Sequence, residues 1–84
     1  MEKKMNFYEF CDIIEKLRAP GGCPWDMEQT HQSIRRDFLE ETYEALDALD
    51  REDVPAMCEE LGDVLMQVAF HAVIEEENGR FTAA

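Results

Sequence analysis

The chain has 84 residues, enough for one small domain spanning 1–84. Twenty acidic residues against eight basic ones give a formal net charge of −12, which disfavours nucleic acid or an anionic membrane as a partner. The three cysteines lack C-x-x-C spacing, so neither a disulfide framework nor a zinc knuckle is indicated. Without a signal-peptide pattern or a long apolar run, we expect a soluble cytoplasmic protein, in which any anionic ligand binds together with a cation.

The first two predicted helices are separated by a loop rich in proline and glycine. Asn6, followed three residues later by Glu9, resembles an N-cap pair, and apolar residues then recur at helical spacing over 6–18. "APGGCPWD" (19–26) ends this helix because two prolines and two adjacent glycines favour a loop. Asp26, with Gln29 three residues on, is predicted to cap a long second helix that reaches about residue 50.

A third helix follows the break at "REDVP" (51–55). Asp53 is its predicted cap, Pro55 is tolerated in its first turn, and Gly79 is a stop signal. Within it, "VLMQVAFHAVI" (64–74) is apolar around most of its circumference, so it needs neighbours on two sides. The sequence therefore predicts an all-α fold, a helical hairpin plus an N-terminal helix, completed into a four-helix-type bundle as a homodimer or homotetramer.

Two acidic pairs occur at the same spacing on the last two predicted helices. Glu41 and Glu44 lie one turn apart on one face, and Glu60 and Asp63 repeat that i, i+3 spacing. Each pair borders the apolar stripe of its helix. Because a short turn joins the helices as antiparallel neighbours, we expect the two acidic edges to lie within reach of each other.

Four facing carboxylates would repel one another or stay protonated unless a cation neutralised them. Oxygen donors without His or Cys favour Mg²⁺ or Mn²⁺ over zinc, and Mg²⁺ commonly completes its shell with waters and substrate phosphates. Such an ion activates water and neutralises charge on a phosphoryl group, as hydrolysis of a pyrophosphate bond requires. The alternative is an ordinary solvated acidic face that binds no metal.

Three segments carry a family resemblance. "LEETYEALDAL" (39–49) and "EELGDVLMQVAFHA" (59–72) resemble the E-E-x-x-E and E-x-x-D signature of MazG-type nucleotide pyrophosphohydrolases, and "GCPWDMEQTHQS" (22–33) resembles the loop that precedes it. The resemblance implies an all-α protein that assembles into four-helix bundles. It also implies Mg²⁺-dependent hydrolysis of nucleoside triphosphates between the α and β phosphates, which gives a monophosphate and pyrophosphate.

By the same resemblance, four carboxylates are the metal ligands: Glu41, Glu44, Glu60 and Asp63. Glu40 adds a ligand or positions the attacking water, and both roles stay open. Members of the family usually continue past the glycine–arginine–phenylalanine segment into further helix with basic residues, whereas this sequence stops at "NGRFTAA". Five arginines are then candidates to hold a polyphosphate: Arg18, Arg35, Arg36, Arg51 and Arg80. Arg35 and Arg36 are the two expected to bind substrate. The alternative function is a truncated, non-catalytic module that binds metal and nucleotide and associates with itself.

Other residues have both a functional and a structural interpretation. Trp25 is expected to stack on a nucleobase, or else to close the end of the bundle. His31 and His71 can bind phosphate, although a lone helical histidine is more often structural. The three consecutive glutamates of 75–77 are expected to form a solvated helix end.

Overall fold

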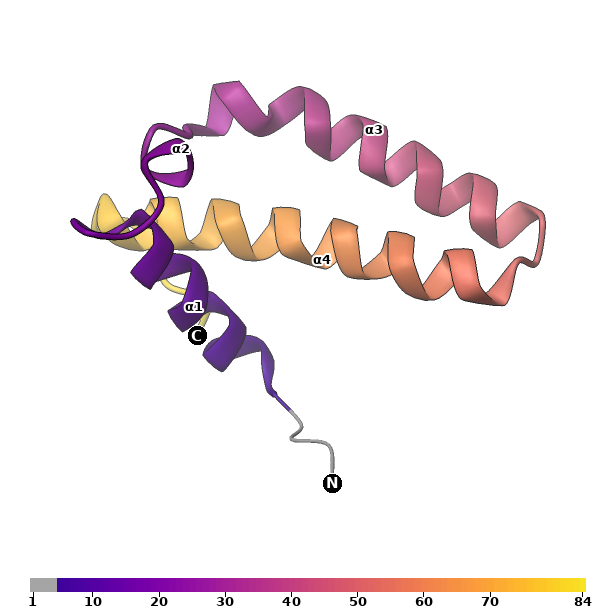
Figure 1. Ribbon diagram of the computed structural model, residues 1–84, viewed down its shortest axis with the longest axis horizontal. Helices are drawn as coiled ribbons and strands as arrows, with labels where there is room; N and C mark the ends of the chain where they lie inside the picture. Colours follow the sequence, from indigo (N-terminus) through magenta and orange to yellow (C-terminus); the bar gives the residue numbers. More distant parts are fainter. Residues whose placement is uncertain (1–4) are drawn as a thin grey trace.

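A hairpin of two long helices forms the frame of the molecule (Figure 1). The computed structural model describes residues 5–84, and within that range there are helices and no strand. The helices are α1 (Phe7–Arg18), α2 (Pro24–Met27), α3 (His31–Asp50) and α4 (Val54–Glu77). α3 and α4 run antiparallel, and α1 crosses the C-terminal half of α4 (Figure 1). The predicted all-α hairpin with an N-terminal helix is confirmed.

The first helix packs through one apolar face. Its predicted cap is present, since Asn6 Oδ1 accepts a hydrogen bond of 2.8 Å from the backbone N–H of Glu9. Cys11 and Ile14 are buried against Ala69 and Val73 of α4, which are three and four residues apart on their own helices. This contact places the C-terminal half of α4 between α1 and α3.

Helix α3, the second helix predicted from the sequence, begins later than expected. Asp26 does not cap it: residues 24–27 form the short α2, and Thr30 in extended conformation is the N-cap of α3. Thr30 Oγ1 accepts from the backbone N–H of Ser33 at 3.1 Å, and Ser33 Oγ accepts from that of Thr30 at 2.8 Å. This reciprocal cap satisfies two backbone donors, which explains why the continuous helix predicted from residue 26 is wrong.

Glycine is required where the chain leaves α1. A Cβ on Gly22 would lie 2.4 Å from the carbonyl oxygens of both Lys16 and Leu17, closer than atoms can approach. The chain therefore folds back tightly on the end of α1. Arg18 binds the returning loop, because its Nη1 donates to the carbonyl oxygens of Asp26 at 2.8 Å and Gln29 at 2.7 Å.

The turn between α3 and α4 and the end of α4 follow the sequence prediction. Asp53 caps α4 by accepting from the backbone N–H of Ala56 at 3.2 Å, and Pro55 lies in the first turn. At the other end Gly79 adopts a φ of 71°, and the backbone N–H groups of Gly79 and Arg80 donate to the carbonyls of Glu76 and Glu75. That pair of bonds is the Schellman ending that a left-handed glycine permits.

Small residues of the two long helices are buried, and larger apolar residues remain exposed. Ala45, Ala48, Ala69 and Ala72 are buried. Many larger side chains are exposed on one side of each helix at i+3, i+4 or i+7 spacing; on α3 they are Leu39, Tyr43, Leu46 and Leu49, and on α4 they are Val54, Leu61, Leu65 and Val68. We call these the exposed apolar stripes. None of the helices in residues 5–84 combines the length and apolarity needed to cross a membrane.

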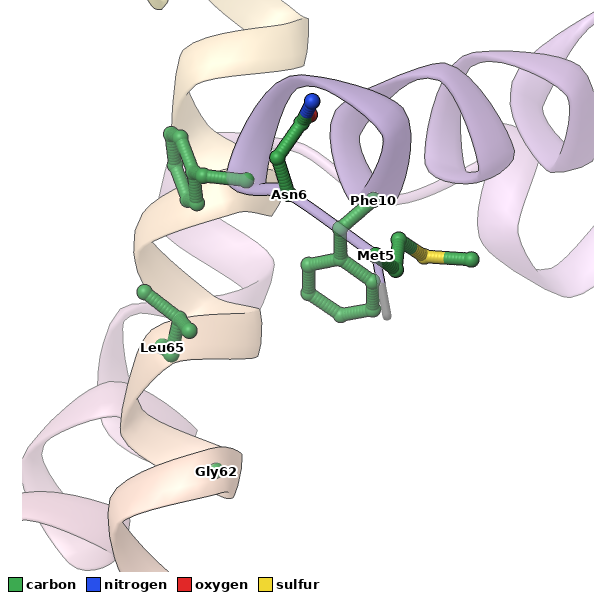
Figure 2. Close-up of a pocket in the computed structure, with 6 residues that line it drawn as sticks. Met5, Asn6, Phe10, Gly62 and Leu65 are labelled. Carbon is green, nitrogen blue, oxygen red and sulfur yellow. The ribbon is translucent and has the colours of Figure 1, made fainter. Parts of the chain in front are cut away.

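An apolar pocket of about 490 Å³ lies between the start of α1 and α4 (Figure 2). Met5, Phe7, Phe10 and Leu65 line it with Asn6 and Gly62. With no charged side chain in its lining, this pocket is unsuited to a polyphosphate. Leu65 also belongs to the exposed apolar stripe of α4, so the pocket and the stripe form one apolar surface.

Candidate functional site

The antiparallel hairpin brings the two acidic segments to the same height. Glu41 of α3 and Asp63 of α4 lie at nearly equal distances along the chain from the turn that joins the helices. Glu60 lies one turn before Asp63 on the same face of α4. We call the boundary between the two helices, where these side chains meet, the α3–α4 seam.

Three of the predicted carboxylates converge there. One oxygen each of Glu41, Glu60 and Asp63 lies within 4.8 Å of the others, and all three residues are half-buried. We call these three the carboxylate cluster. Glu41 Oε2 and Glu60 Oε2 are buried without a hydrogen-bond partner. Oxygens around a divalent cation at about 2.1 Å lie roughly 3–4 Å apart, so a small rotation of these side chains would suit Mg²⁺ or Mn²⁺. Carboxyl oxygens without a hydrogen-bond partner, and with no His or Cys beside them, are the donors that such a hard cation prefers.

Burial and mutual repulsion make the charged form of this cluster unfavourable. Burial, a hydrogen bond with Glu44, and the negative charges of Glu44, Asp63 and Glu41 raise the pKa of Glu60 to about 7. Burial, followed by the charges of Asp63 and Glu44, also raises the pKa of Glu41. A cation bound between them would reverse these effects, because it favours the deprotonated form.

We expect Glu60 to make the metal-free chain less stable as the pH rises from about 4.5 to about 7. In this window the folded chain retains a proton on Glu60 that the unfolded chain has released, so raising the pH favours unfolding. Glu75 affects stability in a separate pH range. Its pKa is lowered to about 2, so protonation removes its stabilising contribution only as the pH falls below 4.5. Urea unfolding followed by circular dichroism measures the slope. Glu60→Gln should flatten it, and an unchanged slope in that variant would refute the assignment.

The other two predicted acidic residues lie at the edge of the cluster or outside it. Glu44 is exposed but adjoins Glu60, whose pKa it raises through a hydrogen bond. Glu40 is exposed and accepts a hydrogen bond of 3.1 Å from Nε of Arg36, one turn earlier on α3. A role for Glu40 in the chemistry would therefore require this surface ion pair to open.

The predicted substrate-binding residues are accessible but are not gathered at the cluster. Trp25 lies on α2 with 63% of its surface exposed, so in the single chain its ring is accessible to a ligand. Arg35 lines a shallow pocket of about 290 Å³ with Phe38, Leu39 and Thr42, and Arg36 is engaged by Glu40. Among the five arginines, all of which lie within residues 5–84, Arg35 alone forms no ion pair.

The remaining arginines have structural partners. Arg18 donates to both carboxylate oxygens of Glu77, with Nε at 2.7 Å, in addition to its two loop carbonyls. Arg51 pairs with Asp47 and Asp53 at the α3–α4 turn. Arg80 pairs with Glu75. These contacts explain how a strongly acidic chain uses its few cations, and they leave Arg18, Arg51 and Arg80 unavailable unless their ion pairs break.

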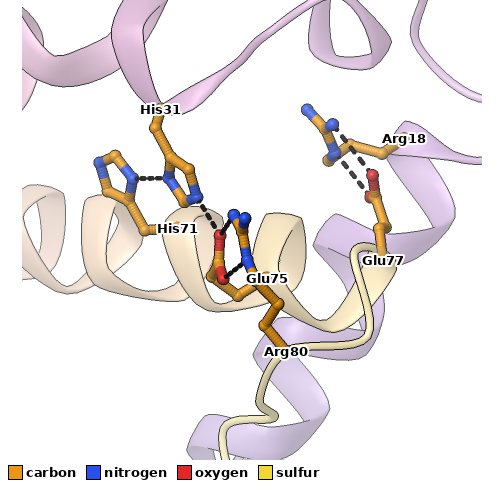
Figure 3. Close-up of polar contacts among 6 residues, drawn as sticks. All are labelled: Arg18, His31, His71, Glu75, Glu77 and Arg80. Atoms are coloured by element: carbon orange, nitrogen blue, oxygen red, sulfur yellow. Dashed lines mark hydrogen bonds and ion pairs between the residues drawn. The ribbon is translucent and has the colours of Figure 1, made fainter.

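A polar network that the sequence did not predict joins α3, α4 and the segment after α4 (Figure 3). Nδ1 of His31 lies 2.6 Å from Nδ1 of His71, and Nε2 of His31 lies 2.6 Å from Oε1 of Glu75. Arg80 binds the other side of the Glu75 carboxylate, with Nε 2.6 Å from Oε2. Hydrogen bonds from Arg80 and His31 lower the pKa of Glu75 to about 2.

The expectation that Glu75 lies in a solvated helix end is therefore wrong. Only 8% of its surface is exposed, because it faces α3 and the returning C-terminal segment while Glu76 and Glu77 are exposed. A signal was present in the sequence. Gln67 and His71, the polar residues of the otherwise apolar stretch 64–74, and Glu75 directly after it recur every four residues, which places them on one face.

The fold and the cluster together describe an all-α domain with a carboxylate site between two antiparallel helices. Comparison with protein families gives the particular assignment: the model of the MazG nucleotide pyrophosphohydrolase domain matches residues 29–84. The chain belongs to this family, and the resemblance carried by the two acidic segments is confirmed.

Curated relatives agree with the family assignment. The chain is 53% identical over 76 residues to the nucleoside triphosphate pyrophosphohydrolase/pyrophosphatase MazG of Thermotoga maritima, covering 90% of the chain and 30% of that protein. It is 54% identical over 70 residues to the nucleoside triphosphate pyrophosphohydrolase of Escherichia coli K12, covering 82% and 27%. An uncharacterized protein of Bacillus subtilis, YabN, is 54% identical over 84 residues, covering 96% and 17%. The chain thus spans less than a third of the length of these relatives.

Proposed function

We propose that this chain is a Mg²⁺-dependent nucleoside triphosphate pyrophosphohydrolase, which converts a nucleoside triphosphate and water to a nucleoside monophosphate and pyrophosphate. The observation that supports this most is the carboxylate cluster, with two orphaned anionic oxygens, in a domain of the MazG family. Relatives that share more than half of the aligned residues are named for this activity. The same cluster accepts Mn²⁺ in place of Mg²⁺ on donor chemistry alone.

Each acidic residue has a distinct role in the proposal. Glu41, Glu60 and Asp63 hold the ion, and Glu44 completes the set by turning inward from the rim beside Glu60. When bound, the ion would neutralise phosphate charge and lower the pKa of a water. Glu40 separates from Arg36 and then orients the attacking water or adds a ligand. The ion pair of Glu40 with Arg36 is exposed to solvent, so opening it costs little free energy.

The nucleotide is proposed to lie along the exposed side of α3 and α2. Arg35 has no competing ion pair, and Arg36 is freed when Glu40 turns toward the cluster, so both guanidinium groups can bind phosphate oxygens. The exposed ring of Trp25 offers a stacking surface for the base. Stacking tolerates any base, so broad substrate use in the cytoplasm fits this arrangement.

Assembly of two or four copies is part of the proposal. The exposed apolar stripes of α3 and α4 consist of large side chains that a monomer would leave in water. Packing the stripes of two hairpins against each other completes a four-helix bundle and buries them. Sedimentation equilibrium measures the assembly: a dimer or tetramer is expected, and a monomer at high concentration would refute this part.

The activity is tested by incubating the chain with mixed nucleoside triphosphates and Mg²⁺, and separating the products by ion exchange. Release of monophosphate and pyrophosphate that stops when chelator is added is the expected result. Stabilisation by Mg²⁺ without any release would favour the alternative, a non-catalytic module that binds metal and nucleotide. The engagement of Arg18, Arg51 and Arg80 by carboxylates is the observation that keeps this alternative in view.

A further inference from the structure

The buried polar atoms without partners all lie on one seam. In residues 5–84, the buried side-chain nitrogen and oxygen atoms that lack a hydrogen bond are Glu41 Oε2, Glu60 Oε2, Gln67 Oε1 and His71 Nε2. Glu60, Gln67 and His71 share one face of α4, and Glu41 lies opposite on α3. Buried polar groups are nearly always satisfied, so such a concentration indicates a place where a ligand or water completes the bonding. The seam extends beyond the carboxylate cluster as far as His71.

His71 lies on the α3–α4 seam and also contacts His31; we call these two residues the histidine pair. Its ring lies beside Phe38, with centroids 5.5 Å apart, and Phe38 is one turn from Glu41 on α3. Helical side chains lean toward the N-terminus of their helix, so the ring covers the turn that carries Gln67. Figure 3 shows the second ring nitrogen, Nε2, on the side of His71 away from His31 and Glu75.

The contacts of His31 determine the hydrogen positions of the pair. Nε2 of His31 lies 2.6 Å from a carboxylate oxygen of Glu75, an acceptor, so this nitrogen carries a hydrogen. In the neutral pair Nδ1 of His31 is then bare, and the 2.6 Å contact requires a hydrogen on Nδ1 of His71. Nε2 of His71 is consequently bare, an acceptor facing the seam.

One added proton converts Nε2 of His71 from a hydrogen-bond acceptor into a donor. The proton can reside on either ring, but in both cases a single hydrogen stays between the two Nδ1 atoms and Nε2 of His71 becomes an N–H donor. A second proton would place two N–H groups head to head, so the pair takes up only one. Burial and the neighbouring His31 lower the pKa of His71, which favours the neutral form of that ring in the free chain.

The charged residues around the histidine pair indicate what its protonation would do. His31 comes from α3, Glu75 from α4, and Arg80 from the segment after α4; Arg18 of α1 is bound to Glu77 nearby (Figure 3). A polyphosphate at the carboxylate cluster adds negative charge to a chain whose arginines, except Arg35, are already paired. The histidine pair is the group on the α3–α4 seam that can become positive in response.

We propose that His71, oriented by His31 and Glu75, is a further residue of the nucleotide site and takes up one proton from solvent when a polyphosphate binds beside the carboxylate cluster. This inference rests on the proposed function. The resulting Nε2–H donates toward the bound anion along the seam, and His31 and Glu75 act as positioning residues.

The histidine rings can be observed directly, because the chain contains two histidines and both belong to the pair. Chains labelled with ¹⁵N-histidine are saturated with Mg²⁺ and titrated near pH 7 with a nucleoside triphosphate analogue that has a methylene group between the α and β phosphates. Without analogue, His31 should carry its hydrogen on Nε2 and His71 on Nδ1. With analogue, Nε2 of His71 should shift from the value of a bare nitrogen to that of a protonated one.

Each contrary result has its own meaning. If the Mg²⁺-loaded chain fails to bind the analogue, the proposed function fails and this inference fails with it. If the analogue binds and Nε2 of His71 stays bare, this inference alone is wrong. A hydrogen on Nε2 of His71 in the free chain at alkaline pH would also overturn it, since the geometry of the pair excludes that form.

A conservative variant separates binding from a merely structural role. His71→Asn keeps a hydrogen-bonding group near the Nδ1 position and removes Nε2, so the contact with His31 can persist. The affinity for the analogue should fall about tenfold, and its dependence on pH between 6 and 8 should become weaker than in the parent, as expected for loss of one charge-assisted hydrogen bond. Unchanged affinity and an unchanged pH profile in a folded His71→Asn chain would refute the assignment.

Discussion

Replacing Glu41 by Gln should lower the turnover of nucleoside triphosphate by at least about 100-fold and leave the hairpin folded. Loss of an outer-shell partner of a metal site commonly costs 10–100-fold, and the proposal makes Glu41 a direct ligand. The metal-free variant should be more stable than the parent above pH 7, because burial and the charges of Asp63 and Glu44 oppose ionisation of Glu41. Initial rates at saturating Mg²⁺, together with urea unfolding, measure both effects.

Glu59→Gln is the matched control for that substitution. It makes the same chemical change on the residue next to Glu60, but Glu59 is exposed and lies outside the carboxylate cluster. Its turnover should stay close to that of the parent. Equal turnover of all three proteins would mean that the cluster is a solvated acidic patch without a part in the chemistry.

Arg18→Met should destabilise the chain by about 3 kcal/mol, a large fraction of the stability of so small a domain. Only 8% of the Arg18 side chain is exposed, and the guanidinium donates to the carbonyl oxygens of Asp26 and Gln29, which would lose their partner. The ion pair with Glu77 contributes less, because 41% of that side chain is exposed. Methionine keeps an apolar stem against Phe70, over which the guanidinium lies at 5.5 Å. Urea unfolding monitored by circular dichroism gives the change.

Arg36→Met provides the comparison for a surface arginine. Arg36 pairs with Glu40 at i, i+4 spacing in solvent, and such pairs contribute about 0.3–0.5 kcal/mol. The free energy of unfolding of the Arg36→Met chain should therefore be nearly unchanged. If Arg18→Met were as mild as Arg36→Met, the loop of 19–30 would not depend on the arginine that contacts it.

The ends of the helices were predictable wherever a local chemical signal decides them. Asn6, Asp53 and Gly79 act through bonds to backbone groups three or four residues away, so the sequence contains both partners. The start of α3 was not predictable in this way. Asp26 and Thr30 are both acceptable caps, and the contact of Arg18 with the loop, which depends on the packing of α1, accompanies the later start.

The carboxylate cluster was predictable in part, since helical spacing and a short turn bring Glu41, Glu60 and Asp63 together. Spacing could not separate Glu44, which remains at the rim. Residues three apart differ in direction by about 60° around the helix, so the i, i+3 pattern does not decide whether both members of a pair face the neighbouring helix. The burial of Glu75 was missed for another reason. It depends on His31 and Arg80, two partners that only the folded chain brings to one carboxylate.

Direct measurement of Mn²⁺ binding shows whether the α3–α4 hairpin holds a divalent cation in its carboxylate cluster. The free Mn²⁺ signal in electron paramagnetic resonance is titrated with the parent chain, Glu41→Gln and Glu59→Gln at one ionic strength. We predict that the parent and Glu59→Gln remove free Mn²⁺ at a fixed ratio to protein and that Glu41→Gln does not. Equal binding by all three, or binding by none, would contradict the proposed metal site.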